Sequence, residues 1–468
     1  MKVLFASSEI YPYAKTGGLA DVSEALPSAL KRHVDVSRVM PLYGFMDKKK
    51  FKLHDAFSVK IVKNEYEIEI FRQSKGGIVN YFVKAPLLSD TENLYGNKDG
   101  DYVDNDSRFA IFCKAVVELS KRLSVETIHL NDWQTALVAF FVKESALDIK
   151  TVLTIHNLAY QGVFAYETLS KLGIDEKYFN IDAFEFYGKA NFLKAGVAYS
   201  NAVTTVSPTY AKEILTHEFG CGLEGFLAHH KDKIGGILNG VNAKLYDPSS
   251  DKSIEFAYDA SSVEIKRENK VAFIKNSTLK DPRKPLFAMV SRLVEQKGID
   301  LIMESLEETL AKKINLFILG DGSQKVCDRL SELSQKYDNF EFREGFSDAL
   351  SRQTYAAADF FLMPSVFEPC GLSQFIAMRY GATPIVHGVG GLKDSVFEEE
   401  NGLGRGIVYS NQNKEEFLGA IDRALELKKN SLKFKELIKS NMQRDFSFES
   451  SALAYLEIYK GLQCLKKN

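Results

Sequence analysis

The sequence has no excess of one charge and no long apolar run. Its 468 residues include 60 basic and 62 acidic side chains, which give a formal net charge of −2. This balance excludes a general nucleic-acid-binding protein, because such a protein needs a clear basic excess to neutralise phosphates. No apolar run approaches the roughly 20 residues of a membrane-spanning helix, so we expect no membrane partner.

Cysteine is also scarce. The five cysteines are scattered along the chain and include no CxxC pair. This pattern indicates neither a disulfide framework nor a zinc site. The apolar stretch near the start ends at Ser7 and is too short for the core of a signal peptide. We therefore expect a reduced protein in the cytoplasm, and the composition predicts nothing about its oligomeric state.

What the chain does contain is an alternation of strand-like and helical patterns in both halves. Such alternation is typical of parallel sheets with helices on both faces. The chain is also too long for one typical core, so we predict an α/β fold of two doubly wound domains. The strand-like runs are residues 3–6, 127–130, 151–155, 202–206, 285–290, 315–320, 340–342, 360–363 and 383–386.

Three segments depart from this alternation. Residues 57–83 alternate apolar and polar side chains, which predicts an antiparallel hairpin with one exposed face. Residues 91–107 are rich in Asn, Asp and Gly and predict a long loop of the kind that is often functional. Residues 450–462 form a final helical pattern, and we place the domain boundary near Gly240 and Val241.

The segment Lys15–Asp21, KTGGLAD, lies between the first strand and its helix. Paired glycines allow the backbone to approach a phosphate, and the amides at a helix start supply positive potential. Taken alone, the motif fits an ordinary glycine turn about as well. The second domain repeats the arrangement, because Arg292 and Lys297 also follow a strand and lie close enough to reach one diphosphate.

Polar side chains follow other strands as well. Glu368 comes before Gly371–Ser373, where a helix start offers amides to an anion, and another glycine loop spans Gly388–Gly391. His156 begins a polar segment that suits a sugar, and Asp132 precedes the single Trp. Open α/β sheets bind ligands beyond the carboxyl ends of their strands, so we predict an active site in the cleft between the two domains.

Six motifs, in this order, resemble the bacterial glycogen synthase and plant starch synthase family over nearly the whole chain. The resemblance implies a GT-B fold, in which two Rossmann-like domains face a central cleft. It implies an N-terminal catalytic domain over residues 1–241, a nucleotide-sugar domain over 242–445, and a helix over 446–468 that returns to the first domain. The motifs are residues 15–21, 155–162, 192–214, 236–241, 291–300 and 364–374.

The resemblance also implies the reaction. Glucose would pass from ADP-glucose to the 4-hydroxyl at the non-reducing end of an α-1,4-glucan, with retained configuration. The partners would be a nucleotide sugar and an α-glucan, and no metal or other cofactor would be needed. Retention is compatible with a front-face route, in which the leaving phosphate assists, or with double displacement through a carboxylate.

By motif, the resemblance assigns each predicted site residue to a role. Lys15, Gly17, Gly18, Arg292, Lys297, Gly371, Leu372 and Ser373 would hold the donor diphosphate, and Phe346 would stack on the adenine. Glu368, His156, Asn239 and Asp21 would line the glucose pocket, Asp132 would lie near the reacting centre, and Glu9 and Tyr95 would bind the acceptor.

Several positions depart from the usual pattern of the family. Asn131 stands where a His often precedes Asp-Trp, and Asn242 replaces a common Asp. Phe346 stands where Tyr is common, and Val389 replaces the Thr of a TGGL loop. These differences bear on donor affinity and on the choice between ADP and UDP. The alternatives are a UDP-glucose-using glucan synthase, a glucan phosphorylase that binds pyridoxal phosphate, and a non-catalytic glucan-binding homologue.

Overall fold

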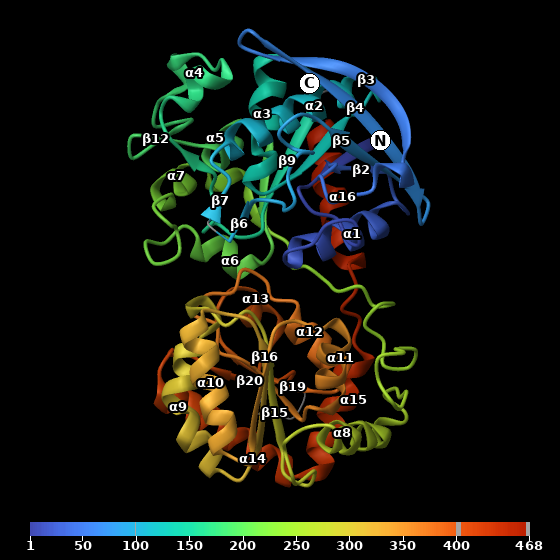
Figure 1. The fold of residues 1–468 in the computed structure, drawn as a ribbon, viewed down its shortest axis with the longest axis vertical. Helices are drawn as coiled ribbons and strands as arrows, with labels where there is room; N and C mark the ends of the chain where they lie inside the picture. The colour runs from blue at the N-terminus through green and yellow to red at the C-terminus, as the bar shows by residue number, and fades with distance from the viewer. Residues whose placement is uncertain (99, 399–403, 465–468) are drawn as a thin grey trace. The chain divides into compact units, whose positions relative to one another are not determined.

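The computed structural model describes residues 1–98, 100–398 and 404–464. The chain forms two compact units (Figure 1). Unit 1 contains Met1–Asn239 and Phe448–Asn468, and unit 2 contains Gly240–Ser447. Residues 465–468, the end of the third segment expected from the sequence, lie outside the described residues. Each unit is built on a Rossmann-like sheet, which confirms the predicted α/β class.

The sheet of unit 1 has nine strands in the order β14-β13-β9-β8-β1-β2-β5-β4-β3. From β14 to β5 the neighbouring strands are parallel, and their apolar residues form a core that is closed to water. The strands are β1 (Lys2–Ala6), β2 (Asp35–Pro41), β3 (Lys52–Ile61), β4 (Asn64–Lys75), β5 (Ile78–Lys84), β8 (Thr127–Asn131), β9 (Lys150–Ile155), β13 (Ala202–Thr205) and β14 (Ile234–Gly236).

The predicted antiparallel hairpin is confirmed as β3 and β4, which pair with each other and extend the sheet from β5. The predicted loop over 91–107 is wrong at its end, because Asn105–Ser107 form the first turn of helix α2. The cause is Arg108, which is fully buried and donates to the carbonyls of Leu87 and Leu94. This buried cation gathers the polar segment around it, so the segment packs instead of remaining an open loop.

Helix α16, the last helix in the sequence, belongs to unit 1 and packs against α1, the first helix (Figure 1). The loops of unit 1 contain two further small sheets. One pairs β6 (Gly96–Asn97) with β7 (Gly100–Asp101), and the other joins β10 (Val163–Phe164), β11 (Glu185–Phe186) and β12 (Lys189–Asn191). The helices are α1 (Gly18–Leu30), α2 (Asn105–Arg122), α3 (Trp133–Glu144), α4 (Thr168–Leu172), α5 (Phe192–Tyr199), α6 (Pro208–Glu213), α7 (Glu224–His229) and α16 (Glu449–Cys464).

Unit 2 has a six-stranded, entirely parallel sheet in the order β17-β16-β15-β18-β19-β20. Its strands are β15 (Leu286–Val290), β16 (Asn315–Gly320), β17 (Phe340–Glu344), β18 (Phe360–Met363), β19 (Thr383–His387) and β20 (Ile407–Tyr409). Its helices are α8 (Lys266–Lys275), α9 (Ile299–Ala311), α10 (Gln324–Lys336), α11 (Asp348–Ala357), α12 (Ser373–Arg379), α13 (Gly390–Ser395), α14 (Lys414–Lys429) and α15 (Ser431–Gln443).

Both sheets reverse their strand order at one point. In unit 1 the reversal lies between β1 and β8, and in unit 2 between β15 and β18. Parallel α/β sheets bind ligands beyond the carboxyl ends of the strands at such a reversal. The segments after these four strands are therefore where a site is expected in each unit. Within the parts of the chain that the structure describes, every helix is too short or too polar to span a lipid bilayer.

Candidate active site

The glycine loop after β1 is held by one buried carboxylate, that of Glu9. Its oxygens accept from the Thr16 N–H and the Thr16 hydroxyl, both at 2.6 Å, and from the Gly17 N–H at 3.4 Å. The hydroxyl of Tyr95 donates to the same carboxylate at 2.7 Å. Glu9 is only 3% exposed. Both residues predicted to bind the acceptor thus lie behind the loop and fix its shape.

The loop then runs directly into helix α1. Gly17 is the N-cap and Gly18 the first helical residue, so the Gly18 N–H belongs to the first turn, whose amides have no partner within the helix. Lys15 donates to both carboxylate oxygens of Asp21, at 2.9 and 2.8 Å. The structure therefore brings the predicted residues Lys15, Gly17, Gly18 and Asp21 together at the N-terminal end of α1. The Lys15 ammonium is paired there with the Asp21 carboxylate.

Asp132 and His156 meet at the carboxyl ends of β8 and β9. The Asp132 carboxylate accepts the backbone N–H of His156 at 2.7 Å. Burial raises the pKa of Asp132 to about 7, and burial lowers the pKa of His156 to about 3. Asp132 also has a positive φ of 56°, which is unusual for a residue with a side chain. Both residues are only partly buried, so a ligand can reach the corner that they form.

The segment after His156 is fixed by groups that sequence reasoning did not select. The Tyr210 hydroxyl accepts the Leu158 N–H at 3.0 Å. Gly162 has a positive φ of 63°, and a Cβ there would lie 2.4 Å from the Trp133 ring. The tryptophan next to Asp132 therefore serves as packing for this segment. One hint of the Gly162–Trp133 contact was present in the sequence, because the only Trp of the chain follows the candidate acid Asp132.

In unit 2, two of the predicted residues form an ion pair across the strand reversal. The Lys297 ammonium donates to the Glu368 carboxylate at 2.5 Å, and the Ser365 hydroxyl donates to the same oxygen at 3.0 Å. Lys297 follows β15 and Glu368 follows β18, so the two strands at the reversal each supply one partner. Glu368 is 5% exposed, which makes the pair strongly desolvated on the carboxylate side.

The other donor-side residues lie around this pair. Arg292 is exposed, and among the described residues its guanidinium has no hydrogen-bond or ion-pair partner. Gly371 has a positive φ of 72° and precedes Leu372, the N-cap of α12, whose first residue is Ser373. Phe346 follows β17 and is 73% exposed, so its ring face is open to a ligand.

Asn239 is the last residue of unit 1 before the chain enters unit 2. It is 6% exposed, and its Oδ1 has no hydrogen-bond partner among the described residues. A buried polar oxygen without a partner costs free energy unless a ligand or water satisfies it. The asparagine is therefore poised to accept a hydrogen bond.

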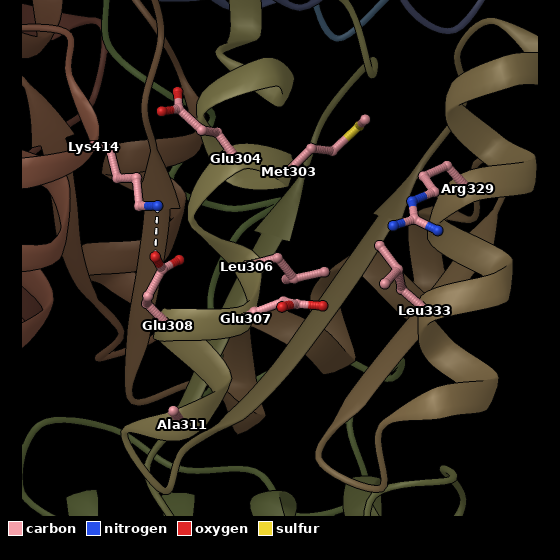
Figure 2. A pocket seen from close by; sticks show the side chains of 9 residues that line it. All are labelled: Met303, Glu304, Leu306, Glu307, Glu308, Ala311, Arg329, Leu333 and Lys414. Atoms are coloured by element: carbon pink, nitrogen blue, oxygen red, sulfur yellow. Dashed lines mark ion pairs between the residues drawn. The ribbon is translucent and has the colours of Figure 1, made fainter.

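A separate pocket of about 530 Å³ lies on unit 2 along α9 and α10. Figure 2 shows apolar side chains in its lining, among them Leu306 and Leu333, with the Lys414–Glu308 ion pair at one side. None of the predicted site residues lines it. Asp321, Cys327 and Glu344 form a cluster with metal-ligand atoms within 4.8 Å of one another, also apart from the predicted residues. Neither feature adds to the candidate site.

Two family models match the chain. The starch synthase catalytic domain matches residues 2–229, and the group 1 glycosyl transferases match residues 270–440. Glycogen synthase from Aquifex aeolicus is 42% identical over 99% of both chains. Glycogen synthase from Bacillus cereus is 39% identical over 99% of this chain and 100% of its own.

Solved structures agree with the sequence relatives. The catalytic domain of starch synthase IV from Arabidopsis thaliana, bound to ADP and acarbose, superposes with a TM-score of 0.89 and 32% identity. The match covers 98% of this chain and 99% of that one. These full-length similarities, with the motif residues gathered at both strand reversals, show that the chain is a glycosyltransferase that belongs to the glycogen synthase and starch synthase family.

Proposed function

We propose that this enzyme transfers glucose from ADP-glucose to the 4-hydroxyl at the non-reducing end of an α-1,4-glucan, with retention. The observation that carries the proposal is the Lys297–Glu368 pair at the strand reversal of unit 2. A cation for a diphosphate and a carboxylate for sugar hydroxyls are the two groups that a nucleotide sugar requires there. The ADP and acarbose bound to the Arabidopsis relative support this choice of ligands.

On the donor side, Arg292 and Lys297 bind the diphosphate, and the amides of Gly371–Ser373 at the start of α12 add positive potential. Departure of ADP develops negative charge, which fixed cations and amides stabilise without reorganising. Binding of the diphosphate draws Lys297 from Glu368, and the freed carboxylate then accepts from hydroxyls of the glucose. The exposed ring of Phe346 stacks on the adenine.

Unit 1 supplies the glucose and acceptor contacts. Lys15 and the Gly18 amide act at the sugar-phosphate junction, and Gly17 lets the backbone come close. His156, Asn239 and Asp21 bind hydroxyls of the glucose. Asp132 holds the backbone of His156 and lies near the reacting centre. Glu9 and Tyr95 fix the shape of the glycine loop. We place the acceptor against these two residues at the edge of that loop.

Retention follows from a front-face route. Glu9 and Asp21 are held by neighbouring donors, and Glu368 accepts from hydroxyls of the glucose once the diphosphate is bound, so we assign none of them as a nucleophile. We therefore assign deprotonation of the acceptor hydroxyl to the departing phosphate. The oxocarbenium-like sugar is stabilised by the negative charge that it leaves behind. All five cysteines are free thiols, which is typical of a reducing compartment, so we propose a cytoplasmic location.

The test is a side-by-side donor assay on a glycogen primer. We expect glucose incorporation from ADP-glucose at a rate well above that from UDP-glucose. Faster transfer from UDP-glucose would reassign the donor. Phosphorolysis of glycogen together with the visible absorption of a Schiff base would instead indicate a phosphorylase, and binding without incorporation from either donor would indicate a non-catalytic protein.

A further inference from the structure

The side-chain amide of Asn131, the last residue of β8, lies at the Nε2 edge of the His156 ring. Asn131 is completely buried, at 0% exposure. Its Nδ2 donates to the Ala6 carbonyl at 2.8 Å, and its Oδ1 lies 2.9 Å from the His156 Nε2. The Asn131 backbone is also fixed, because its N–H donates to the Thr135 hydroxyl at 2.7 Å. This amide therefore has one orientation.

That orientation determines which imidazole nitrogen carries a proton. A backbone carbonyl can only accept, so the NH₂ group of Asn131 must face Ala6 and its carbonyl oxygen must face His156. A carbonyl oxygen can only accept as well, so the His156 Nε2 must be the donor. Burial keeps the pKa of His156 near 3, so the ring is neutral and the Nδ1 holds the lone pair.

The Nδ1 is the nitrogen that remains for a ligand. Among the described residues, no group forms a hydrogen bond with it, and the His156 side chain is only partly buried. A neutral nitrogen with a lone pair accepts from a hydroxyl and offers nothing to a phosphate oxygen. We propose that Asn131 is a positioning residue that fixes His156 as the Nε2–H tautomer, so that His156 recognises a sugar hydroxyl as a hydrogen-bond acceptor.

This inference rests on the proposed function, since the hydroxyl belongs to the transferred sugar. An imidazole at position 131 could titrate, whereas the amide of Asn131 cannot. The titratable groups around this corner are His129 on β8, Asp132 after it, Glu9 after β1 and Tyr210 on α6. Asn131 offers the His156 ring only an acceptor oxygen, so this contact fixes which nitrogen of the neutral ring carries the proton.

The experiment measures the tautomer directly in the full-length enzyme, by two-bond ¹H–¹⁵N correlation of the imidazoles, with His156→Gln used to assign the signal. In the wild type at neutral pH we expect a protonated Nε2 and an unprotonated Nδ1. In Asn131→Leu we expect both tautomers, with kcat/KM for ADP-glucose lowered roughly three- to tenfold, the value of one hydrogen bond. In Asn131→Asp, the carboxylate should raise the pKa of His156 and move the acid limb of the kcat/KM profile upward.

The matched control is Asn201→Leu, which removes an amide at the opposite end of β9, where its Oδ1 accepts the Thr151 N–H at 2.8 Å. It should leave the His156 signal and the pH profile unchanged. A wild-type spectrum with the proton on Nδ1 overturns the proposal even if every variant fails to fold. An unchanged tautomer in Asn131→Leu also overturns it. Loss of the proposed function appears separately, as a wild type that transfers no glucose.

Discussion

At the scale of single residues, most charged groups of the candidate site already have partners, and Arg292 is the exception among the described residues. Lys297 is paired with Glu368, Lys15 with Asp21, and Glu9 with donors of the glycine loop. A ligand that enters must replace these contacts with equally good ones. Removal of one partner therefore has two effects: it weakens ligand binding and leaves the other charge buried without compensation.

For Lys297→Ala, we expect kcat/KM for ADP-glucose to fall by about 30-fold or more, which corresponds to ~2 kcal/mol of lost transition-state stabilisation. Steady-state rates on a glycogen primer measure this. Lys336→Ala, which removes an exposed ion pair with Glu307 on the same unit, is the control and should retain wild-type rates. Wild-type kinetics in Lys297→Ala would remove the diphosphate role.

For Asp132→Asn, we expect a pH-dependent gain in stability. The pKa of Asp132 is raised from 3.8 to about 7 by burial, so the folded state holds this proton more tightly than the unfolded state. Wild-type stability therefore falls as pH rises between these values. Asn cannot ionise, so urea unfolding should show that the stability of the variant increases relative to the wild type from about pH 4 to about pH 7. Exposed Asp148→Asn should show no such trend.

At the scale of elements, the parallel strands could be predicted because buried strands leave uninterrupted apolar runs between glycine or polar turns. The site residues could be predicted as far as they follow such strands. Their partners could not: nothing local in the sequence tells that Glu9 would hold the loop at Thr16, or that Asn131 would contact His156. The Asn131–His156 contact joins the ends of two strands that only the sheet order brings together, and the Glu9–Thr16 contact depends on how the loop between β1 and α1 folds back on itself.

The connection from β15 to α9 passes closely under the end of β18. Gly298 has a φ of +72°, and a Cβ there would lie 1.8 Å from the Pro364 carbonyl oxygen. Gly298→Ala should therefore lower the free energy of unfolding by about 1–3 kcal/mol, measured by urea denaturation. Gly419→Ala, within α14 and with no atom within 4 Å of its Cβ, should be neutral or stabilising by up to ~1 kcal/mol.

Helix α16 is tied to the central sheet by polar contacts as well as apolar ones. The Tyr459 hydroxyl lies 2.6 Å from the Nδ1 of His129, a buried residue of β8 whose pKa is lowered to about 3 by burial. Tyr459→Phe should lower the free energy of unfolding by about 1–2 kcal/mol, because a buried imidazole nitrogen loses its partner. Exposed Glu457→Gln on the same helix should change it little.

The sign of the His129 contribution is also fixed. Its folded state is neutral, so its share of stability is present above its ordinary pKa of 6.5 and is lost as pH falls toward 3. Acid should therefore weaken the attachment of α16. In Tyr459→Phe the free energy of unfolding should already be lower near neutral pH and should fall further as the pH is lowered. Unfolding measured over a series of pH values tests this.

At the scale of the whole molecule, ligand contacts are expected on both units, each at its own strand reversal. Hydrogen exchange maps this without a structure of the complex. With ADP alone, we expect slower exchange in residues 291–298 and 364–373 of unit 2. The β3–β4 hairpin, residues 52–75, should exchange at an unchanged rate. Protection confined to the hairpin would contradict the proposed donor site.

The helix that completes unit 1 comes from the far end of the chain. Val3 and Phe5 share a buried cluster with Tyr455 and Tyr459, although all of unit 2 separates them in sequence. During translation, the ribosome must therefore finish unit 2 before the core of unit 1 can close. Unit 2 is a continuous segment inserted into unit 1, so it can fold as soon as it leaves the ribosome. Until α16 is made, the face of β1 that this helix covers stays exposed.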